Sequence, residues 1–312
     1  MRLRTNRLLK NSSNPKNILF LVRTLCQKPA IAATAKKKYN EIGYVSQHFE
    51  SDGLQLVGRL TEPHLTNGGK TTGLVLCHGF PSVSVGEKDS AQSYYDLADL
   101  ISDHLGWFVF AITYRGCGNS EGNFSLRGWL NDTINAARHL SQINKVETVY
   151  AVGFGTGGAL AISAAALCEE ISGVAAVSPP SDFNDWIKEP KDLLSYARKV
   201  GVITDSDFPE NRDEWIQELS EIQTMESAGA MKEKPLLLLH GADDRVVPSF
   251  DARVIADAHG SADLRIIEGA THRLRFDPRT TAVLIGWLDR VNRSNLNRMT
   301  TGQNFLKQEE QL

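Results

Sequence analysis

The residues most suggestive of chemistry form a glycine-rich stretch at positions 151–158, with the sequence AVGFGTGG. A strand-like segment, 148–150, precedes it, and a helix-like segment, 159–162, follows it. A strand, a tight turn and a helix in this order are the setting of a nucleophile elbow, where a G-x-S-x-G turn lifts one side chain above the sheet edge and points the next amides at an oxyanion. The third position here is Gly155. Because glycine has no atom that can form an acyl-enzyme, the pattern predicts the turn without its nucleophile.

The segments that must position this turn alternate between two periodicities. An alternating pattern over 45–60, interrupted by Asp52-Gly53, predicts an N-terminal β-hairpin. Apolar runs then predict strands at 72–77, 107–113, 148–150, 171–177, 235–239 and 264–267, and helical spacing predicts helices at 94–105, 126–137, 159–167, 249–258 and from 278. Strands that alternate with helices of this length predict an α/β fold with a mostly parallel, doubly wound sheet.

Two segments depart from this regular alternation. Residues 180–233 hold Trp186 and Trp215 among many charged residues, which predicts short amphipathic helices that form a small cap over the strand ends. After Arg293 the chain is polar, and its composition predicts a disordered tail over 294–312. The folded domain is therefore expected to span 41–293. Its last helix is expected to begin at Pro278, with Asp277 as the N-cap.

The first forty residues differ in charge from the rest of the chain. They hold ten Lys and Arg residues and no acidic residue, so the other residues hold 24 basic and 37 acidic side chains, a formal net charge of −13. A basic, hydroxyl-bearing and acid-free N-terminus is typical of a mitochondrial transit peptide. The sequence thus predicts a leader at 1–40 and a location in the mitochondrial matrix, with a disordered basic tail as the alternative.

Composition also argues against several kinds of partner and site. The acidic balance of residues 41–312 argues against nucleic acid. No run approaches eighteen apolar residues, so no transmembrane segment is predicted. Cys77, Cys117 and Cys168 lack the C-x-x-C spacing and the even number that a zinc site or a disulfide framework requires. We predict no metal and no cofactor.

Several further motifs, in the correct chain order, resemble those of the α/β-hydrolase superfamily over roughly 43–291. His78-Gly79-Phe80 resembles the turn after the third strand of that fold, and 115–120, RGCGNS, resembles its R-G-x-G-x-S loop. Residues 241–248, GADDRVVP, look like its G-x-x-D-x-x-V-P segment, and His272 follows in GATH. The resemblance implies that Asp244 is the acid and His272 the base, and that the amides of Phe80 and Thr156 form the oxyanion hole.

The departure from that family lies at the elbow. Gly155 is comfortable at the strained backbone angles of an elbow, so it keeps the turn while removing the nucleophile. The N-myc downstream-regulated proteins, which are considered non-enzymatic, are similar in this respect. Thr156, Ser178 and Ser181 are the hydroxyl groups near enough in the sequence pattern to act as displaced nucleophiles.

Three functions follow from these residues. The first is a non-hydrolysing protein whose cavity binds a partner or a small apolar or acyl-type ligand. The second is an enzyme in which Asp244 and His272 form a general-base dyad that activates water or abstracts a substrate proton. The third is a serine hydrolase of ester or acyl substrates with a displaced nucleophile. Any apolar ligand is inferred only from the amphipathic cap.

Overall fold

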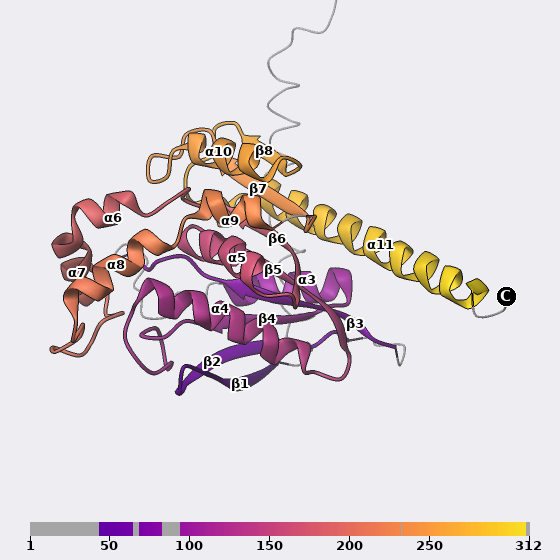
Figure 1. The fold of residues 1–312 in the computed structure, drawn as a ribbon, viewed down its shortest axis with the longest axis horizontal. Coiled ribbons are helices and arrows are strands. Elements are labelled where there is room, and N and C mark those ends of the chain that lie inside the picture. The colour runs from indigo at the N-terminus through magenta and orange to yellow at the C-terminus, as the bar shows by residue number, and fades with distance from the viewer. Residues whose placement is uncertain (1–43, 65–68, 83–93, 232, 310–312) are drawn as a thin grey trace, which may run out of the picture. The chain divides into compact units, whose positions relative to one another are not determined.

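A computed structural model describes residues 44–64, 69–82, 94–231 and 233–309, and describes side chains as far as residue 294. The expected leader, residues 1–40, lies outside the described residues. The strands are β1 (Tyr44–Ser51), β2 (Leu54–Thr61), β3 (Thr71–Cys77), β4 (Phe108–Thr113), β5 (Val146–Phe154), β6 (Ile171–Val177), β7 (Leu236–Gly241) and β8 (Asp263–Ile267). They form one sheet with the order β1-β2-β4-β3-β5-β6-β7-β8 (Figure 1).

The strand directions confirm the predicted α/β-hydrolase fold. β1 and β2 form the antiparallel N-terminal hairpin, β2 pairs antiparallel with β4, and the strands from β4 to β8 are parallel. β3 and β4 are continuous apolar runs because helices cover both faces of the sheet, which leaves nearly all of their side chains buried. The carboxyl ends of the parallel strands meet at one edge, where a ligand site is expected.

The helices that cover the sheet are α3 (Tyr95–Leu105), α4 (Leu126–Ser141), α5 (Thr156–Leu167), α10 (Ser249–His259) and α11 (Pro278–Glu309). Buried side chains of α3 and α11, such as Ile101 and Trp287, pack into one apolar cluster. Those of α4, α5 and α10, such as Trp129 and Ile162, pack into a second cluster. Each cluster lies on one face of the sheet, because adjacent strand residues alternate between the two.

Four short helices lie between β6 and β7, in the segment predicted to form the cap. They are α6 (Asn184–Lys188), α7 (Pro190–Lys199), α8 (Arg212–Glu221) and α9 (Thr224–Ala230). The cap is attached to the domain by buried contacts, including a hydrogen bond of 3.1 Å from Trp215 Nε1 to the carbonyl oxygen of Phe124. Trp215 itself is buried, so this indole is a structural part of the cap.

The C-terminal segment corrects one expectation. Composition predicts disorder over 294–312, but α11 begins at Pro278 and continues to Glu309. A helix extends by one hydrogen bond for each residue that it adds, and the polar residues after Arg293 include good helix formers and no proline. The predicted N-cap is confirmed, since the Asp277 carboxylate accepts a hydrogen bond of 2.9 Å from the Arg279 amide.

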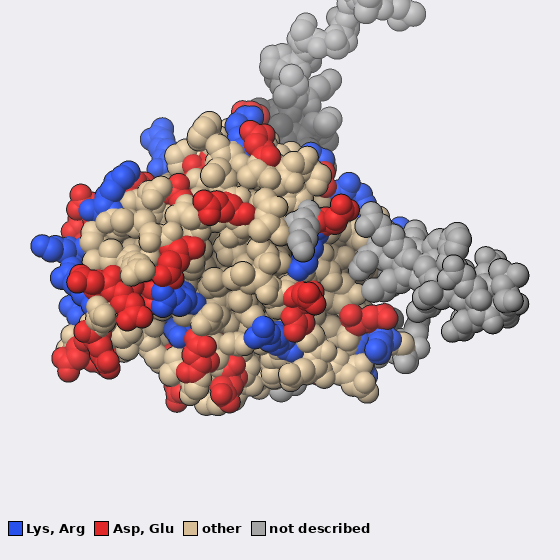
Figure 2. Space-filling view, viewed as in Figure 1, with Lys and Arg blue, Asp and Glu red and all other residues tan. Residues whose placement is uncertain are grey.

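Charged side chains of both signs are mixed on the face of the described residues seen in Figure 2, without a continuous basic stripe. None of the helices within the described ranges has the length and apolar character needed to cross a bilayer.

Candidate functional site

The turn after β5 has the backbone geometry that its sequence predicts. Gly155 is the N-cap of α5, with φ 53° and ψ −123°, a conformation that side-chain-bearing residues rarely adopt. The Gly155 amide donates a hydrogen bond of 2.8 Å to the carbonyl oxygen of Val177 on the next strand. Gly157 is also required, because a Cβ atom there would lie 2.3 Å from the carbonyl oxygen of His78. The small residues therefore let α5 begin in direct contact with the ends of β3 and β5.

Asp244 and His272 lie together, although 27 residues separate them in the chain. Asp244 follows β7, and His272 lies in the loop between β8 and the final helix. The Nδ1 atom of His272 donates to the Oδ2 atom of Asp244 at 2.8 Å. The Oδ1 atom of Asp244 accepts hydrogen bonds from the amides of Val246 and Val247 at 2.9 and 3.0 Å. The carboxylate is thus fixed by its own loop and leaves the Nε2 atom of His272 unprotonated when the ring is neutral.

A second histidine, His240, contacts the same carboxylate. Its Nε2 atom lies 3.0 Å from the carbonyl oxygen of Val247 and 3.3 Å from Oδ2 of Asp244. Burial opposes the charge of Asp244, but hydrogen bonds from His240, His272 and the two valine amides outweigh it and hold the pKa of Asp244 well below its usual range. Asp244 is therefore ionised. Sequence reasoning gives His240 only a structural role, and its position four residues before Asp244 is the signal that could have found this contact.

The ring of His272 faces the position at which a Gly155 side chain would begin. A Cβ atom built on Gly155 would lie 3.7 Å from Nε2 and 3.9 Å from Cε1 of His272, and these are its nearest neighbours. A hydroxymethyl group at this position would bring its oxygen within reach of Nε2. Gly155 and the dyad therefore border a common space, which contains no side-chain atom because residue 155 is a glycine.

The two amides expected to bind an oxyanion border the same cavity. Phe80 and Thr156 both line it, and within the described ranges neither of their amide nitrogens donates to another backbone or side-chain group. Gly79 lets the loop approach β5, because a Cβ atom there would lie 3.0 Å from the carbonyl oxygen of Phe154. Neither amide is thus engaged by another group of the described residues, as the predicted oxyanion role requires.

Two hydrogen bonds of His78 hold the loop that carries Gly79 and Phe80. Its Nδ1 atom donates to the carbonyl oxygen of Gly79 at 2.8 Å, and its Nε2 atom accepts from the Tyr114 amide at 3.4 Å. Burial lowers the pKa of His78 to about 4, so the ring is neutral at physiological pH and carries no proton to a ligand. These contacts agree with the structural role expected from the sequence.

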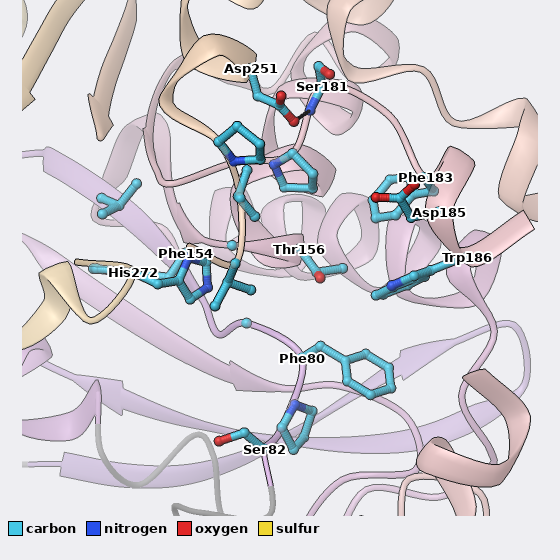
Figure 3. A pocket seen from close by; sticks show the side chains of 18 of the residues that line it. Phe80, Ser82, Phe154, Thr156, Ser181, Phe183, Asp185, Trp186, Asp251 and His272 are labelled. Carbon is cyan, nitrogen blue, oxygen red and sulfur yellow. Dashed lines mark hydrogen bonds between the residues drawn. The ribbon is translucent and has the colours of Figure 1, made fainter. Parts of the chain in front are cut away.

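The cavity has a volume of about 770 Å³, which lies within the range of small-molecule sites. Figure 3 shows His272 and Trp186 on opposite sides of it, with Thr156 between them. Its cap side is aromatic and is formed by Phe80, Phe183, Trp186 and Tyr196. The Phe80 ring centre lies 5.2 Å from that of Trp186 and 6.2 Å from that of Tyr196. The dyad thus borders one end of the cavity, and the rings around Trp186 border the other, where Asp185 also lies.

Two of the three hydroxyl groups considered as displaced nucleophiles, those of Ser178 and Ser181, are placed less favourably. Ser178 Oγ is buried without a hydrogen-bond partner among the described residues, and Ser178 does not line the cavity. Ser181 lines it, but Figure 3 shows Ser181 beside Asp251, away from His272. Thr156 lines the cavity as the first residue of α5. Within the ranges that the structure describes, no group of three or more His, Cys, Asp or Glu residues could hold a metal ion.

Comparison with known proteins gives matches in sequence. The model of the alpha/beta hydrolase family matches residues 74–284. The uncharacterised protein YfhR of Salmonella typhi is 28% identical over 155 residues, which are 46% of this chain and 47% of YfhR. YfhR of Escherichia coli O157:H7 is 30% identical over 143 residues, 45% of this chain and 44% of that protein. The chain thus spans about half the length of the curated relatives it matches.

Solved structures match over most of the chain. Est1E from Butyrivibrio proteoclasticus with bound ferulic acid has a TM-score of 0.60 at 20% identity, and covers 80% of this chain and 99% of its own. The alpha/beta hydrolase GrgF from Penicillium sp. sh18 has a TM-score of 0.62 at 18% identity, with 81% and 99% covered. The Pyrococcus furiosus esterase Pf2001 has a TM-score of 0.58 at 18% identity, with 81% and 94% covered. At these identities the likeness shows a shared fold.

Proposed function

Since the chain belongs to the α/β-hydrolase family, we propose that it is a member without the serine nucleophile, which binds an acyl-type small molecule and does not form an acyl-enzyme. The observation that carries this proposal is Gly155. It has the backbone angles of an elbow, and a side chain there would point at Nε2 of His272, yet glycine supplies no nucleophilic atom. In this respect the chain is similar to the N-myc downstream-regulated proteins.

The remaining parts of the site support binding. The cavity, the two residues with unengaged amides and the oriented imidazole lie around Gly155, so hydrogen-bonding groups border one end of a chamber that also contains several aromatic rings. A ligand with a carbonyl oxygen and an apolar body matches this distribution. The family's fold alone does not determine a reaction, so the site residues decide between binding and catalysis.

A search for co-purified ligands tests the proposal. The protein is purified under native conditions, its intact mass is measured, and a denatured sample is extracted for small molecules. We expect an acyl compound in the wild type and its loss in a Trp186→Arg variant, whose longer charged side chain would occupy the aromatic end. A protein that turns over esters through a covalent adduct on any residue would refute the proposal.

The second candidate function is hydrolysis by a dyad, and the open space beside Nε2 of His272 favours it specifically. A water molecule there would give one proton to Nε2 while its oxygen attacks the carbonyl carbon, and the amides of Phe80 and Thr156 would stabilise the oxyanion. The leaving group would then take the proton from Nε2. If such turnover exists, His272→Ala should reduce it by about 10²–10⁴-fold.

We also propose a mitochondrial matrix location, which rests on the basic, acid-free composition of residues 1–40. A reporter fused after residues 1–40 should enter mitochondria. A variant of that fusion in which three arginines are replaced by glutamate should stay in the cytosol, and cytosolic staining of both fusions would contradict the proposal.

A further inference from the structure

The polar end of the cavity offers an unusual combination of hydrogen-bonding groups. The amides of Phe80 and Thr156 are donors, and within the described ranges they have no acceptor. Beside them, the Nε2 atom of His272 faces the space above Gly155, 3.7 Å from the position of a Cβ atom. In a serine hydrolase the nucleophile's hydroxyl would fill this space. Here an atom of the bound molecule can occupy this space and contact Nε2.

We propose that the ligand is a free carboxylic acid with a flat aromatic body. One carboxylate oxygen accepts from the amides of Phe80 and Thr156, and the other accepts from the protonated Nε2 atom of His272 in the space left by Gly155. This inference rests on the proposed binding function and names the ligand class for the same cavity. Binding breaks and forms no covalent bond, and the imidazole of His272 carries a proton on Nε2 in the complex.

The charges behind the imidazole favour this arrangement. Asp244 is ionised, because its hydrogen bonds hold its pKa well below the usual range, and it contacts Nδ1 of His272 at 2.8 Å. An imidazolium between two carboxylates, one of the protein and one of the ligand, is stabilised from both sides. Arg273 and Arg275 also line the cavity, with the Arg275 guanidinium 4.4 Å from the ring centre of Tyr94 and 4.2 Å from that of Phe276, and two positive charges in the lining favour an anionic ligand. An ester offers no such second anionic oxygen.

The acidic residues that line the cavity belong to its other side and already have partners. Asp251 accepts the Ser181 amide at 2.9 Å, and Asp182 accepts the Asn184 amide at 2.8 Å. Asp185 pairs with Lys188 at 3.1 Å. Figure 3 places the labelled Asp185 and Asp251 away from His272. A carboxylate at Gly155 would therefore lie beside the imidazole of His272, away from Asp185 and Asp251.

The aromatic end selects the body of the acid. Phe80, Phe183 and Trp186 form a continuous set of rings, since the Phe80 and Phe183 ring centres lie 5.2 and 5.1 Å from that of Trp186. Aromatic pairs contribute beyond the area that they bury, through offset or edge-to-face contacts. An acid with a planar ring two or three bonds from its carboxylate can reach these rings while its head lies at Gly155. A saturated ring of the same size loses this geometry.

Calorimetry of the full chain with 3-phenylpropanoic acid, its amide and its methyl ester tests the inference. We expect the acid to bind more tightly than the ester at pH 6, and its affinity to fall towards high pH, where the free ring is neutral and must take up a proton to form the complex. In that high-pH range the binding enthalpy should depend on the ionisation enthalpy of the buffer. The amide donates N–H to a neutral Nε2, so its binding should show neither effect.

Two variants locate the proton. His272→Gln keeps a donor for the carboxylate without a titrating ring, so it should bind the acid with no proton uptake. Gly155→Ala places a methyl group where the second carboxylate oxygen would lie, so it should weaken acid binding by at least tenfold. The melting temperature of this variant shows whether it is folded. If it is not folded, the test rests on His272→Gln. Replacing the phenyl ring of the ligand by a cyclohexyl ring should weaken its binding to the wild type. The same replacement should cause a smaller loss of affinity in Trp186→Leu.

The outcomes separate this inference from the proposed function. Tight, pH-independent binding of the amide and the ester, with no preference for the acid, would overturn the carboxylic acid inference and leave a ligand-binding cavity. Proton uptake that persists in His272→Gln would also overturn it. If no compound of the series binds, the inference fails, and the search for co-purified ligands decides the proposed function separately.

Discussion

The two ends of the cavity are built in different ways. At the dyad end, the cavity is bordered by the Gly155 turn and one imidazole, and the imidazole is held by a 2.8 Å hydrogen bond between His272 and Asp244. At the cap end, Phe80, Phe183 and Trp186 are held by ring packing, and Phe183 and Trp186 come from the segment between β6 and β7. Interactions at the dyad end therefore depend on the exact positions of hydrogen-bonding atoms, whereas interactions at the cap end depend on how well aromatic rings fit together.

Because the two ends are built differently, we expect the dyad end to govern reactivity and the cap end to govern which ligand is preferred. The dyad is held by hydrogen bonds of its own loops, such as those from the Val246 and Val247 amides to Asp244, and none of these bonds involves residue 155. Cap residues can change without disturbing the sheet. We therefore expect substitutions at the dyad end to affect reactivity and stability strongly, and substitutions at the cap end to affect ligand choice.

The largest effect is expected from Gly155→Ser. The hydroxyl would lie near Nε2 of His272 and between the two amides, so the variant should become reactive toward fluorophosphonate probes, whereas the wild type should be inert. The strained backbone should cost about 1–3 kcal/mol of unfolding free energy. Labelling followed by mass spectrometry and chemical denaturation measures both effects.

Gly155→Ala is the matched control, since it shares the strain without the hydroxyl. Adding His272→Ala to Gly155→Ser should reduce labelling by about 10²–10⁴-fold. Wild-type labelling that maps to Thr156, Ser178 or Ser181 would favour a displaced-nucleophile hydrolase over our proposal. A folded, unreactive Gly155→Ser variant would show that the dyad and the amides are not aligned.

Gly157→Ala should destabilise the protein by about 3 kcal/mol, because its methyl group would lie 2.3 Å from the carbonyl oxygen of His78 and would push α5 away from the sheet. Gly286→Ala in α11 is the control: nothing lies within 4 Å of its added methyl group, and alanine is the better helix former, so it should stabilise by about 0.5–1 kcal/mol. Thermal unfolding of both variants measures the difference. Equal effects would contradict the close approach of α5.

Asp244→Asn should change the dependence of stability on acid. The folded-state pKa of Asp244 lies below that of the unfolded chain, so its contribution is fully present above the unfolded value of about 3.9 and is lost as pH falls further. The wild type should therefore lose stability between pH 4 and 2 more steeply than Asp244→Asn. Urea unfolding at several pH values measures the two slopes, and parallel curves would mean that the carboxylate gains no such stabilisation.

The smallest effect on reactivity is expected from Trp186→Leu at the cap end. In the Gly155→Ser background, we expect its labelling by a small fluorophosphonate to stay within about twofold, because no dyad atom contacts this indole, while the affinity for aromatic ligands falls by about 1 kcal/mol. Labelling rates and calorimetry on the same preparation measure both. A loss of reactivity as large as that of His272→Ala would show that the two ends are not independent.

Local sequence patterns predicted much of the fold. The strand, turn and helix around Gly155, the N-terminal hairpin and the N-cap at Asp277 each depend on a few neighbouring residues, whose conformational preferences are local. The tail after Arg293 was predicted wrongly as disordered, because its polar composition does not distinguish an unpaired coil from the continuation of an established helix.

By itself, the sequence determined the order of strands and helices along the chain, the glycine at the elbow, and the presence of Asp244 and His272 after the last two strands. These are properties of residue type and spacing. Only the tertiary structure decided which groups meet. It placed His240 on the Asp244 carboxylate, His272 opposite Gly155, and the rings of Phe80 and Trp186 together. Those contacts join segments far apart in the chain, and their distances depend on how the strands and the cap pack, which no local pattern encodes.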